Sequence, residues 1–293
     1  MLDLAIAYRI YPRVSKKPAA WADNKLELSA FCLRSFKESL GPLRVKIWAL
    51  LDGCPPAYED LFRHYFNEDE LVIMNLNSVG NLQTFSIQVD LLSSQTDADL
   101  VYFAEDDYFY LPNALVEMVE FARNNKSVDF VTSYDHSGNY DLPLHRERHW
   151  IKPFGRRHWR TCTATCLTFL ARKDSLLKTR ALFKTYRNRN EDGSIWMAIT
   201  QKWGLLDFRV YGRNLMMFKL WLKTWFWGFR QILFGGSHKL WGPLPSLSTH
   251  LESTCLAPLI DWDTEFRRAE QNSALPGGGS EAVSLVNAGD DRM

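Results

Sequence analysis

The 293-residue chain has almost no net charge, few cysteines and no uninterrupted apolar run long enough to span a bilayer. Its formal charge at pH 7 is +1, whereas proteins that bind nucleic acid in bulk usually carry a strong basic excess. It also lacks a GxxxxGK[ST] phosphate loop and an HxxEH-type metal motif. These absences argue against a nucleic-acid partner and remove the usual signatures of a phosphohydrolase.

The cysteines are too few and too scattered for a disulfide framework, and their number is odd: Cys32, Cys54, Cys162, Cys166 and Cys255. The closest pair, Cys162 and Cys166, has no accompanying CxxC, so a zinc site is not expected. The N-terminal apolar run is too short for a signal peptide and carries Asp3. We therefore expect a cytoplasmic location, which includes peripheral attachment to the inner face of a membrane.

The most apolar stretch covers residues 216–234 and is rich in Trp, Phe and Leu. Lys219, Lys223 and Arg230 interrupt it, so it fails as a transmembrane span. Aromatic residues mixed with basic ones are typical of a helix that lies on a membrane surface. The alternative is a helix that packs its aromatic side chains on a sheet, and the sequence leaves both open.

Short apolar runs alternate with segments of helical periodicity along most of the chain. Strands are expected at 4–10, 45–51, 71–74, 100–103, 128–133 and 163–171, and helices at 25–40, 58–65, 82–92, 115–122, 174–180 and 191–199. This alternation predicts an α/β fold, a single domain over residues 1–275 with a mostly parallel sheet and helices on both faces. A basic loop is expected at 145–160, and a disordered tail at 276–293, where small and acidic residues dominate.

Carboxylates follow two of the expected strands directly. Asp52 ends the second strand, and Glu105, Asp106 and Asp107 follow the fourth. Ligands of doubly wound sheets bind beyond the carboxyl ends of the strands, and clustered carboxylates suit a hard divalent ion. Because neighbouring side chains of an extended chain point to opposite faces, Asp107 would be the chief ligand and Glu105 its same-face partner. Asp106 would point away from the ion, toward the sugar or the backbone. An acidic helix cap is the alternative.

In this order, the motifs resemble those of nucleotide-sugar glycosyltransferases with the GT-A (Rossmann-like) fold, most of all the family 2 type. The resemblance covers residues 2–262 and depends on the opening strand, LLDG at 50–53, AEDDYFYLP at 104–112, EDG at 191–193 and STH ending at His250. The acidic motif begins with Glu rather than Asp, and a single Asp52-Gly53 stands where a paired-acid turn is more usual.

The resemblance implies roles for particular residues. Asp107 and His250 would hold Mn²⁺ or Mg²⁺, and Asp192, next to Glu191, would be the catalytic base. The nucleotide-sugar donor would contact Asp52, Gly80, Asn81, Glu105 and Asp106. An anionic acceptor, such as a lipid-linked diphosphate, could use the forked donors of Arg156 and Arg157, and Trp159 and Trp196 could stack on sugar rings.

The sequence thus predicts a metal-dependent hexosyltransferase of glycan biosynthesis that moves a sugar from a nucleoside diphosphate to a hydroxyl, with inversion. Its partners would be the donor, a sugar, polysaccharide or lipid-linked acceptor, and a membrane surface. Two alternatives remain open: a metal-dependent nucleotidyltransferase or phosphohydrolase, and a non-catalytic membrane-associated binding module.

Overall fold

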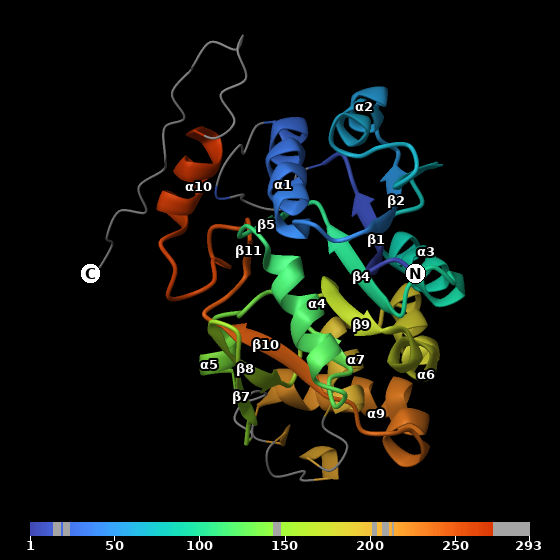
Figure 1. Cartoon of the computed structure of the whole chain (residues 1–293). Helices are drawn as coiled ribbons and strands as arrows, with labels where there is room; N and C mark the ends of the chain where they lie inside the picture. The colour runs from blue at the N-terminus through green and yellow to red at the C-terminus, as the bar shows by residue number, and fades with distance from the viewer. Residues whose placement is uncertain are drawn as a thin grey trace, which may run out of the picture.

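The computed structural model describes residues 1–13, 19, 24–142, 148–200, 204–206, 211–212 and 214–271. The tail predicted to be disordered, residues 276–293, lies outside these ranges. Over the described residues the chain forms one large sheet, a second sheet of two short strands, and helices on both faces of the large sheet (Figure 1).

The large sheet has nine strands, and its strand directions are mixed. In spatial order they are β3 (Leu71–Leu76), β2 (Val45–Asp52), β1 (Leu4–Ile10), β4 (Leu100–Glu105), β9 (Phe169–Arg172), β6 (Phe130–Val131), β10 (Leu240–Leu244), β8 (Arg157–Cys162) and β7 (Ile151–Phe154). The first four are parallel. Only β9 and β8 run against the rest, since each is antiparallel to both of its neighbours. The prediction of a mostly parallel sheet is therefore confirmed.

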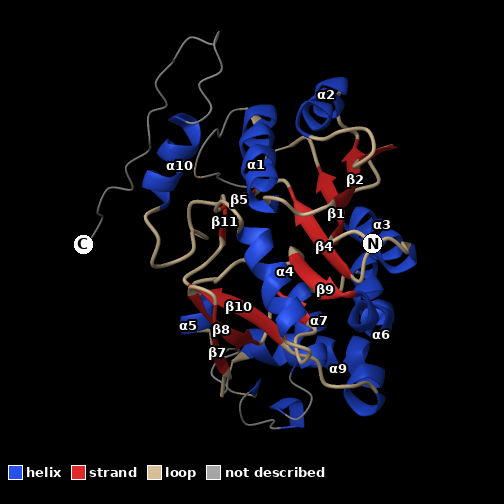
Figure 2. Ribbon diagram, viewed as in Figure 1, coloured by secondary structure: helices blue, strands red, loops and turns tan. Residues whose placement is uncertain are grey.

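The helices cover both faces, as Figure 2 shows. One face packs against α1 (Lys25–Leu40), α2 (Pro56–Tyr65) and α4 (Ala114–Asn124), and α10 (Trp262–Gln271) packs on α1 and on Phe109 of the small sheet. The other packs against α3 (Asn81–Ser94), α6 (Lys173–Phe183), α7 (Asp192–Thr200) and α9 (Leu215–Phe234). Shorter turns of helix are α5 (Gly138–Asp141), η2 (Lys184–Asn188) and η3 (Gly204–Leu206).

The central strand β1 shows why the sequence folds in this way. All seven of its residues are buried, and alternate side chains enter opposite cores: Ile6 and Tyr8 face the layer of α1, whereas Ala5 and Ala7 face the layer of α3. A strand covered on both faces needs a continuous apolar run, and LAIAYRI provides one with a single charged residue, Arg9. That exception marks the site described below.

The structure corrects the predicted loop at 145–160. Within its described part, β7 and β8 form an antiparallel hairpin in which Ile151 pairs with Arg160 and Phe154 with Arg157. Exposed and partly buried side chains alternate in β7, and in β8 the buried Trp159 and Cys162 stand among polar and basic residues, so the sequence carries no run of apolar residues there. Two further features were not predicted: strand β10, and the small sheet of β5 (Tyr108–Tyr110) and β11 (Ser248–His250).

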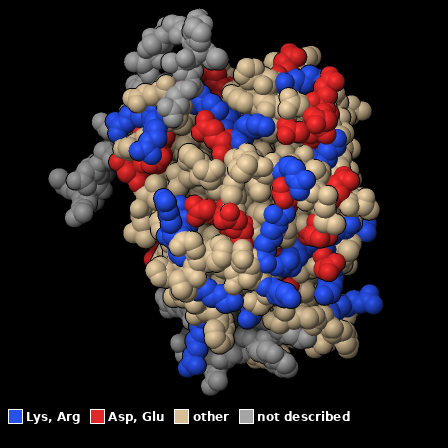
Figure 3. Space-filling view, viewed as in Figure 1, with Lys and Arg blue, Asp and Glu red and all other residues tan. Residues whose placement is uncertain are grey.

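Helix α9 packs one side on the protein, as the second of the two alternatives requires, and the contact with a membrane stays a prediction. Met217, Thr224, Gly228 and Ile232 are buried against the protein, mainly on α7. Its other side exposes large apolar side chains, among them Phe226 (72%) and Phe234 (81%). No helix in the described part of the chain is both long and apolar enough to cross a membrane. On the face seen in Figure 3, Lys and Arg are interspersed with Asp and Glu.

Candidate active site

A cavity of about 350 Å³ opens at the carboxyl edge of the parallel strands. Strands β1, β2 and β4 end there at Ile10, Asp52 and Glu105. Because β1 lies between β2 and β4, the chain reverses its direction of travel across the sheet at β1, which is where doubly wound folds bind ligands. The polar side chains that line this carboxyl-edge cavity are Arg9, Arg13, Lys25, Asp52, Asn81, Thr84, Glu105, Asp106 and Asp107.

Glu105 is held by two donors from other strands. The guanidinium of Arg9 pairs with Oε1, and Thr168 Oγ1 donates to Oε2 over 2.8 Å. Arg9 also donates to the backbone oxygen of Asn81 over 3.1 Å and to the side-chain oxygen of Asn81. Arg9 is only 7% exposed, so its charge must be paired, and this network fixes both β4 and the start of α3 at the cavity wall.

Asp106 faces the helix α1 layer. Lys25 Nζ lies 2.7 Å from its Oδ2, and Ser29 Oγ donates to the same oxygen over 3.3 Å. Burial raises the pKa of Asp106, and the ammonium group of Lys25 opposes that rise. Burial in turn lowers the pKa of Lys25, but the charge and hydrogen bond of Asp106 outweigh it, so the pKa of Lys25 is raised. The predicted alternation does not extend beyond Glu105, because the chain turns at 106–107, and Asp106 lines the same cavity as Glu105 and Asp107.

Asp107 pairs with the late histidine that the sequence singled out. Strand β11 pairs with β5 so that His250 lies opposite Tyr108, and His250 Nε2 is 3.2 Å from Asp107 Oδ2. Burial acts to raise the pKa of Asp107, but His250 outweighs it and the pKa is lowered. Burial acts to lower the pKa of His250, but the hydrogen bond and charge of Asp107 outweigh it, so the pKa of His250 is raised.

The residues present fit a divalent ion. Oδ1 of Asp107 is buried and has no hydrogen-bond partner among the described residues. Two ligands held at about 2.1 Å and at right angles lie about 3 Å apart, close to the observed separation of Asp107 Oδ2 and His250 Nε2. A carboxylate with an imidazole is a donor set that first-row divalent ions such as Mn²⁺ accept.

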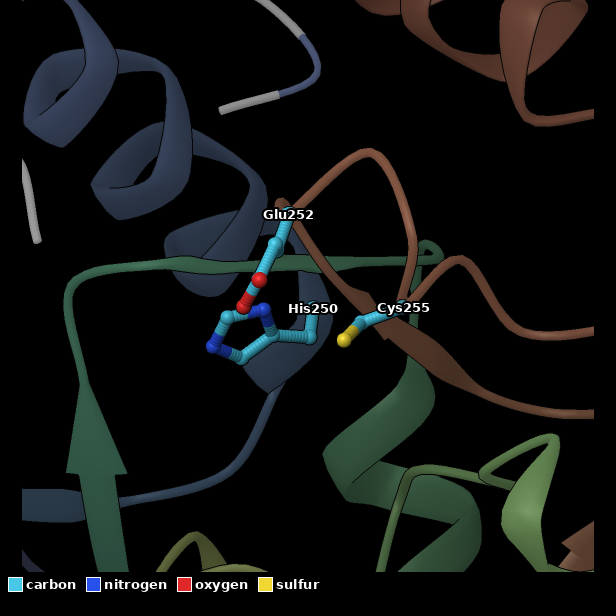
Figure 4. Close-up of side chains that lie close together, drawn as sticks. All are labelled: His250, Glu252 and Cys255. Atoms are coloured by element: carbon cyan, nitrogen blue, oxygen red, sulfur yellow. The ribbon is translucent and has the colours of Figure 1, made fainter. Parts of the chain in front are cut away.

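A second group of donor atoms surrounds the same histidine. His250, Glu252 and Cys255 each offer one ligand atom, and these atoms all lie within 4.8 Å of one another (Figure 4). All three residues are partly buried. The sequence analysis did not single out Glu252 or Cys255. The sequence does place His250, Glu252 and Cys255 close together at the end of a strand, which could have indicated a group of metal ligands. Their spacing matches no common metal motif.

Asp52 holds the loop that precedes α3. Its two carboxylate oxygens accept hydrogen bonds from the backbone N–H groups of Val79 and Gly80, each over 2.7 Å, and the side chain is 2% exposed. Gly80 has a φ of +84°, which favours glycine, and no atom lies within 4 Å of where its Cβ would be. The backbone therefore reaches the cavity without a side chain in the way.

Asn81 follows this loop as the first residue of α3. Its oxygen accepts from Arg9, and its Nδ2 donates to the hydroxyl of Tyr186 over 3.3 Å. Asn81 thus joins the cavity wall to η2. The structure brings together all five residues predicted for donor binding, since each of them lines the carboxyl-edge cavity.

Glu191 and Asp192 lie at the start of α7, and their environments differ. Glu191 is exposed and pairs with Lys223 of α9. Burial raises the pKa of Asp192, and the negative charges of Glu105 and Glu191 add to the rise. The charges of Asp192 and Glu105 also raise the pKa of Cys166, after burial. Asp192 therefore lies near enough to Glu105 for their charges to interact, although neither Glu191 nor Asp192 is among the described residues that line the cavity.

The predicted acceptor residues are not brought together. Trp159 and Trp196 are 0% exposed. Trp159 stacks on Phe121 with ring centroids 4.1 Å apart, and Trp196 packs edge-on against Phe130 and Phe169. Both are core residues, which corrects the prediction that they present a face to a sugar ring.

The two predicted acceptor arginines also separate. Arg157 donates to Glu117 over 2.9 Å and to the backbone oxygen of Pro245 over 2.8 Å, so it ties β8 to α4. Arg156 is exposed at the tip of the β7–β8 hairpin. Of the four residues, Arg156 is the one whose side chain is open to a ligand.

Three residues that hold the acidic motif were not predicted from the sequence: Arg9, Lys25 and Thr168. Arg9 did give a signal, since a charged residue in an otherwise apolar strand must find a buried partner. Lys25 and Thr168 gave none, because their partners are 81 and 63 positions away.

Comparison with known proteins gives distant structural likenesses. No protein-family model and no curated protein matches the chain. Among solved structures, the chain is similar to the galactosyltransferase LgtC with donor and acceptor sugar analogues, at 10% identity and a TM-score of 0.44, over 93% of this chain and 98% of that one.

Two further structures show the same order of likeness. For S. aureus TarS 1-349 with UDP, the values are 11% identity and a TM-score of 0.43, over 67% of this chain and 54% of that one. For the CMP:2-keto-3-deoxy-manno-octonic acid synthetase with CTP, the identity is 12% and the TM-score 0.37, over 61% of this chain and 78% of that one. The chain thus spans about half of the TarS chain.

Proposed function

We propose that this chain is a glycosyltransferase that uses a nucleoside-diphosphate sugar bound in the carboxyl-edge cavity. The observation that carries the proposal is the combination of paired charges there. Arg9 and Lys25 bring two cations to the acidic motif, and Asp107 keeps one buried oxygen without a hydrogen-bond partner among the described residues. A diphosphate leaving group needs such cations, because negative charge develops on it as the glycosidic bond breaks.

The donor would meet the backbone of the 78–80 loop, which Asp52 holds in place. A cavity wall without a side chain at Gly80 leaves room for a nucleoside. Asn81 and Glu105 are both fixed by Arg9, so their remaining oxygen and nitrogen atoms are oriented before a ligand binds. Asp106, held by Lys25, faces the same space.

Asp107 and His250 would hold a Mn²⁺ or Mg²⁺ ion. Such an ion, when bound, neutralises the charge of the diphosphate as a Lewis acid. Their own contribution is to fix that position, since the β5–β11 pairing holds the carboxylate and the imidazole side by side.

Asp192 is proposed as the general base that takes the proton from the acceptor hydroxyl, with inversion at the anomeric carbon. A carboxylate whose pKa is raised by burial is a stronger base than an exposed one. Glu191 helps to keep the pKa of Asp192 raised, and its own ion pair with Lys223 fixes the start of α7 against α9. Arg156 is the remaining candidate for contact with an anionic acceptor.

We further propose that the exposed side of α9 contacts a membrane surface. Leu222, Phe226, Phe229 and Leu233 are all exposed and recur at helical spacing. The helix carries Lys219, Lys223 and Arg230 but no acid. This combination is typical of interfacial helices. Replacing Phe226 and Phe229 with Ser should reduce sedimentation with anionic vesicles, whereas Leu177→Ser, an equally exposed leucine on α6, should not.

The main test measures transfer and hydrolysis across UDP-, GDP- and dTDP-sugars with Mn²⁺. Asp107→Ala should lower the metal-dependent rate by about 10²–10³-fold, since a metal ion supplies several kcal/mol of charge stabilisation. Asp263→Ala removes an exposed carboxylate of α10 and is the control. Full metal-dependent activity of Asp107→Ala would refute the site. Release of diphosphate from a nucleoside triphosphate and a free sugar would instead identify a nucleotidyltransferase.

A further inference from the structure

A second cavity, of about 190 Å³, lies at the opposite edge of the large sheet. It is formed where β7 and β10 begin and where β8 and α7 end. Its polar lining from the described residues is Arg148, His149, Thr161, Thr163, Thr200, Ser237, His238 and Lys239. The lining has two permanent cations and several hydroxyl groups, and none of the described residues in it is an acid. An anion is the ligand that this chemistry suits.

His238 is the buried element of this amino-edge cavity. It is 6% exposed, and its Nδ1 lies 3.2 Å from Oδ1 of Asp129. Asp129 accepts further hydrogen bonds from Ser175 Oγ over 2.7 Å and from the backbone N–H of Lys239 over 2.9 Å, so the carboxylate is fixed. Nε2 of His238 has no hydrogen-bond partner in the described part of the chain. When both ring nitrogens carry hydrogen, Nδ1–H faces the carboxylate of Asp129 and Nε2–H can donate to an anion.

The rim of the amino-edge cavity is apolar and exposed. Trp150 is 69% exposed, and Lys239 Nζ lies 5.5 Å from the centre of its ring. Helix α9 ends three residues before Ser237, and its last residues, Leu233 and Phe234, are 54% and 81% exposed. Figure 1 shows α9 and β7 at the same end of the molecule, away from α10. An anion site with an aromatic rim, next to an exposed apolar helix end, suits an amphiphile better than a free ion.

We propose that the amino-edge cavity binds the phosphate group of an anionic phospholipid while the exposed side of α9 lies on the same bilayer. Arg148 and Lys239 contact the phosphate from the rim, and Nε2 of His238 with the hydroxyl of Ser237 contacts it from inside. Trp150 lies at the level of the headgroups, where its ring and N–H group have apolar and polar neighbours. This inference rests on the membrane contact proposed for α9, and it does not depend on the donor chemistry.

The α9 helix also connects this lipid site to the candidate base. Gly193 of α7 lies against Leu220, and Gly228 lies against Ala198, so α7 and α9 run side by side in the same direction. The start of α9 therefore lies beside Glu191 and Asp192, and its end leads into the amino-edge cavity. A bilayer along α9 would present an acceptor hydroxyl close to Asp192.

The test compares vesicles of equal charge that contain either phosphatidic acid or oleate in phosphatidylcholine. Wild-type protein should bind the phosphatidic acid vesicles more tightly, because only they carry phosphate in excess. Arg148→Ala with Lys239→Ala should weaken that binding by about 30-fold, since each basic residue near an anionic surface contributes about 5-fold. Arg267→Ala, which removes an exposed cation of α10, should leave it unchanged.

The variants separate this inference from the contact proposed for α9. Phe226→Ser with Phe229→Ser should weaken binding to both kinds of vesicle, whereas the double alanine variant should lose chiefly the preference for phosphatidic acid. Equal binding of the wild type to both vesicles overturns the phosphate site even if α9 binds membranes. Saturable binding of inorganic phosphate that Arg148→Ala and Lys239→Ala abolish, without vesicle binding by the wild type, overturns the lipid assignment. Thermal unfolding of each variant checks that it is folded.

Discussion

The two edges of the large sheet differ in how their charged side chains are paired. At the carboxyl edge, each acid of the 105–107 motif has a partner of its own: Arg9, Lys25 or His250. At the amino edge, Arg148 and Lys239 border a cavity in which no described lining residue is an acid. Paired charges hold geometry with little net field, whereas cations that line a cavity without an acid among its described lining residues attract an anion.

This difference indicates different ligands. A site that binds a metal ion and a diphosphate together needs both signs of charge at fixed positions, because it must hold a cation and an anion. A site that docks a headgroup needs one sign, and its contacts can adapt to the ligand. The carboxyl edge meets the first requirement and the amino edge meets the second.

The largest expected effect concerns the two neighbouring acids at the start of α7. Asp192→Asn should lower kcat by about 10²–10⁴-fold, the contribution of a positioned general base. Glu191→Gln should lower it much less, because Glu191 is exposed and acts through Lys223 and its charge. Steady-state kinetics with the best donor of the panel checks this. A greater loss in Glu191→Gln than in Asp192→Asn would reverse the assignment.

The next prediction compares the stability effects of two tryptophans of the β7–β8 hairpin, one in the core and one at the rim of the amino-edge cavity. Trp159→Ala should destabilise the protein by about 3–5 kcal/mol, the usual cost of truncating a buried aromatic side chain. Trp150→Ala should change the free energy of unfolding by less than about 0.5 kcal/mol, as is normal for exposed positions. Urea unfolding measures both. Similar losses in the two variants would mean that Trp150 is part of the core rather than of an exposed rim.

The hairpin also shows where sequence reasoning stops. The parallel half of the sheet was predictable, because strands such as β1 are covered on both faces and must be continuously apolar. Strand β7 is an edge strand in which exposed and partly buried residues alternate, and in β8 the buried Trp159 and Cys162 stand among polar and basic residues, so neither strand has the apolar run that predicts a strand. Tryptophan occurs both in protein cores and on surfaces that stack on sugar rings. The sequence therefore could not tell that Trp159 and Trp196 are core residues, because only their packing shows it.

The candidate site divides in the same way. The positions of Asp52 and of the acidic motif followed from strand ends, because parallel strands bring their carboxyl ends to one edge. The partners of these acids did not follow, since Lys25 is on a helix and Thr168 is on a distant segment. Alternation could not place all three acids, because the strand turns directly after Glu105 and alternation holds only while the chain is extended.

A smaller effect tests whether the carboxyl edge depends on its ion pairs. Arg9→Met removes the cation and leaves Glu105 with Thr168 as its remaining donor. Breaking a buried pair costs about 3–5 kcal/mol, and because Glu105 is 20% exposed we expect about 2 kcal/mol. Chemical unfolding measures the loss. Glu105→Gln in the same chain should restore part of it, and no recovery would mean that Arg9 acts through Asn81 instead.

The smallest effect concerns the carboxylate that holds His238. The pKa of Asp129 is lowered: burial acts to raise it, but hydrogen bonds from His238, Ser175 and the backbone of Lys239 outweigh that. A carboxyl whose pKa is depressed in the folded state stabilises the protein at pH values above its ordinary pKa of 3.8. This contribution is lost as the pH falls through the folded-state pKa. Asp129→Asn should therefore cost about 1 kcal/mol at pH 7 and less as the pH falls below 4.

Unfolding at a series of pH values, with Asp97→Asn as an exposed control, measures this cost. A cost that stayed the same from pH 7 to pH 3 would mean that Asp129 contributes through packing and not through its charge. The imidazole would then lack the fixed anion behind it, and the amino-edge cavity would have to hold a phosphate with Arg148 and Lys239 alone. Vesicle binding by Asp129→Asn distinguishes these cases: reduced preference for phosphatidic acid means that the Asp129–His238 pair contributes, and an unchanged preference means that the rim cations suffice.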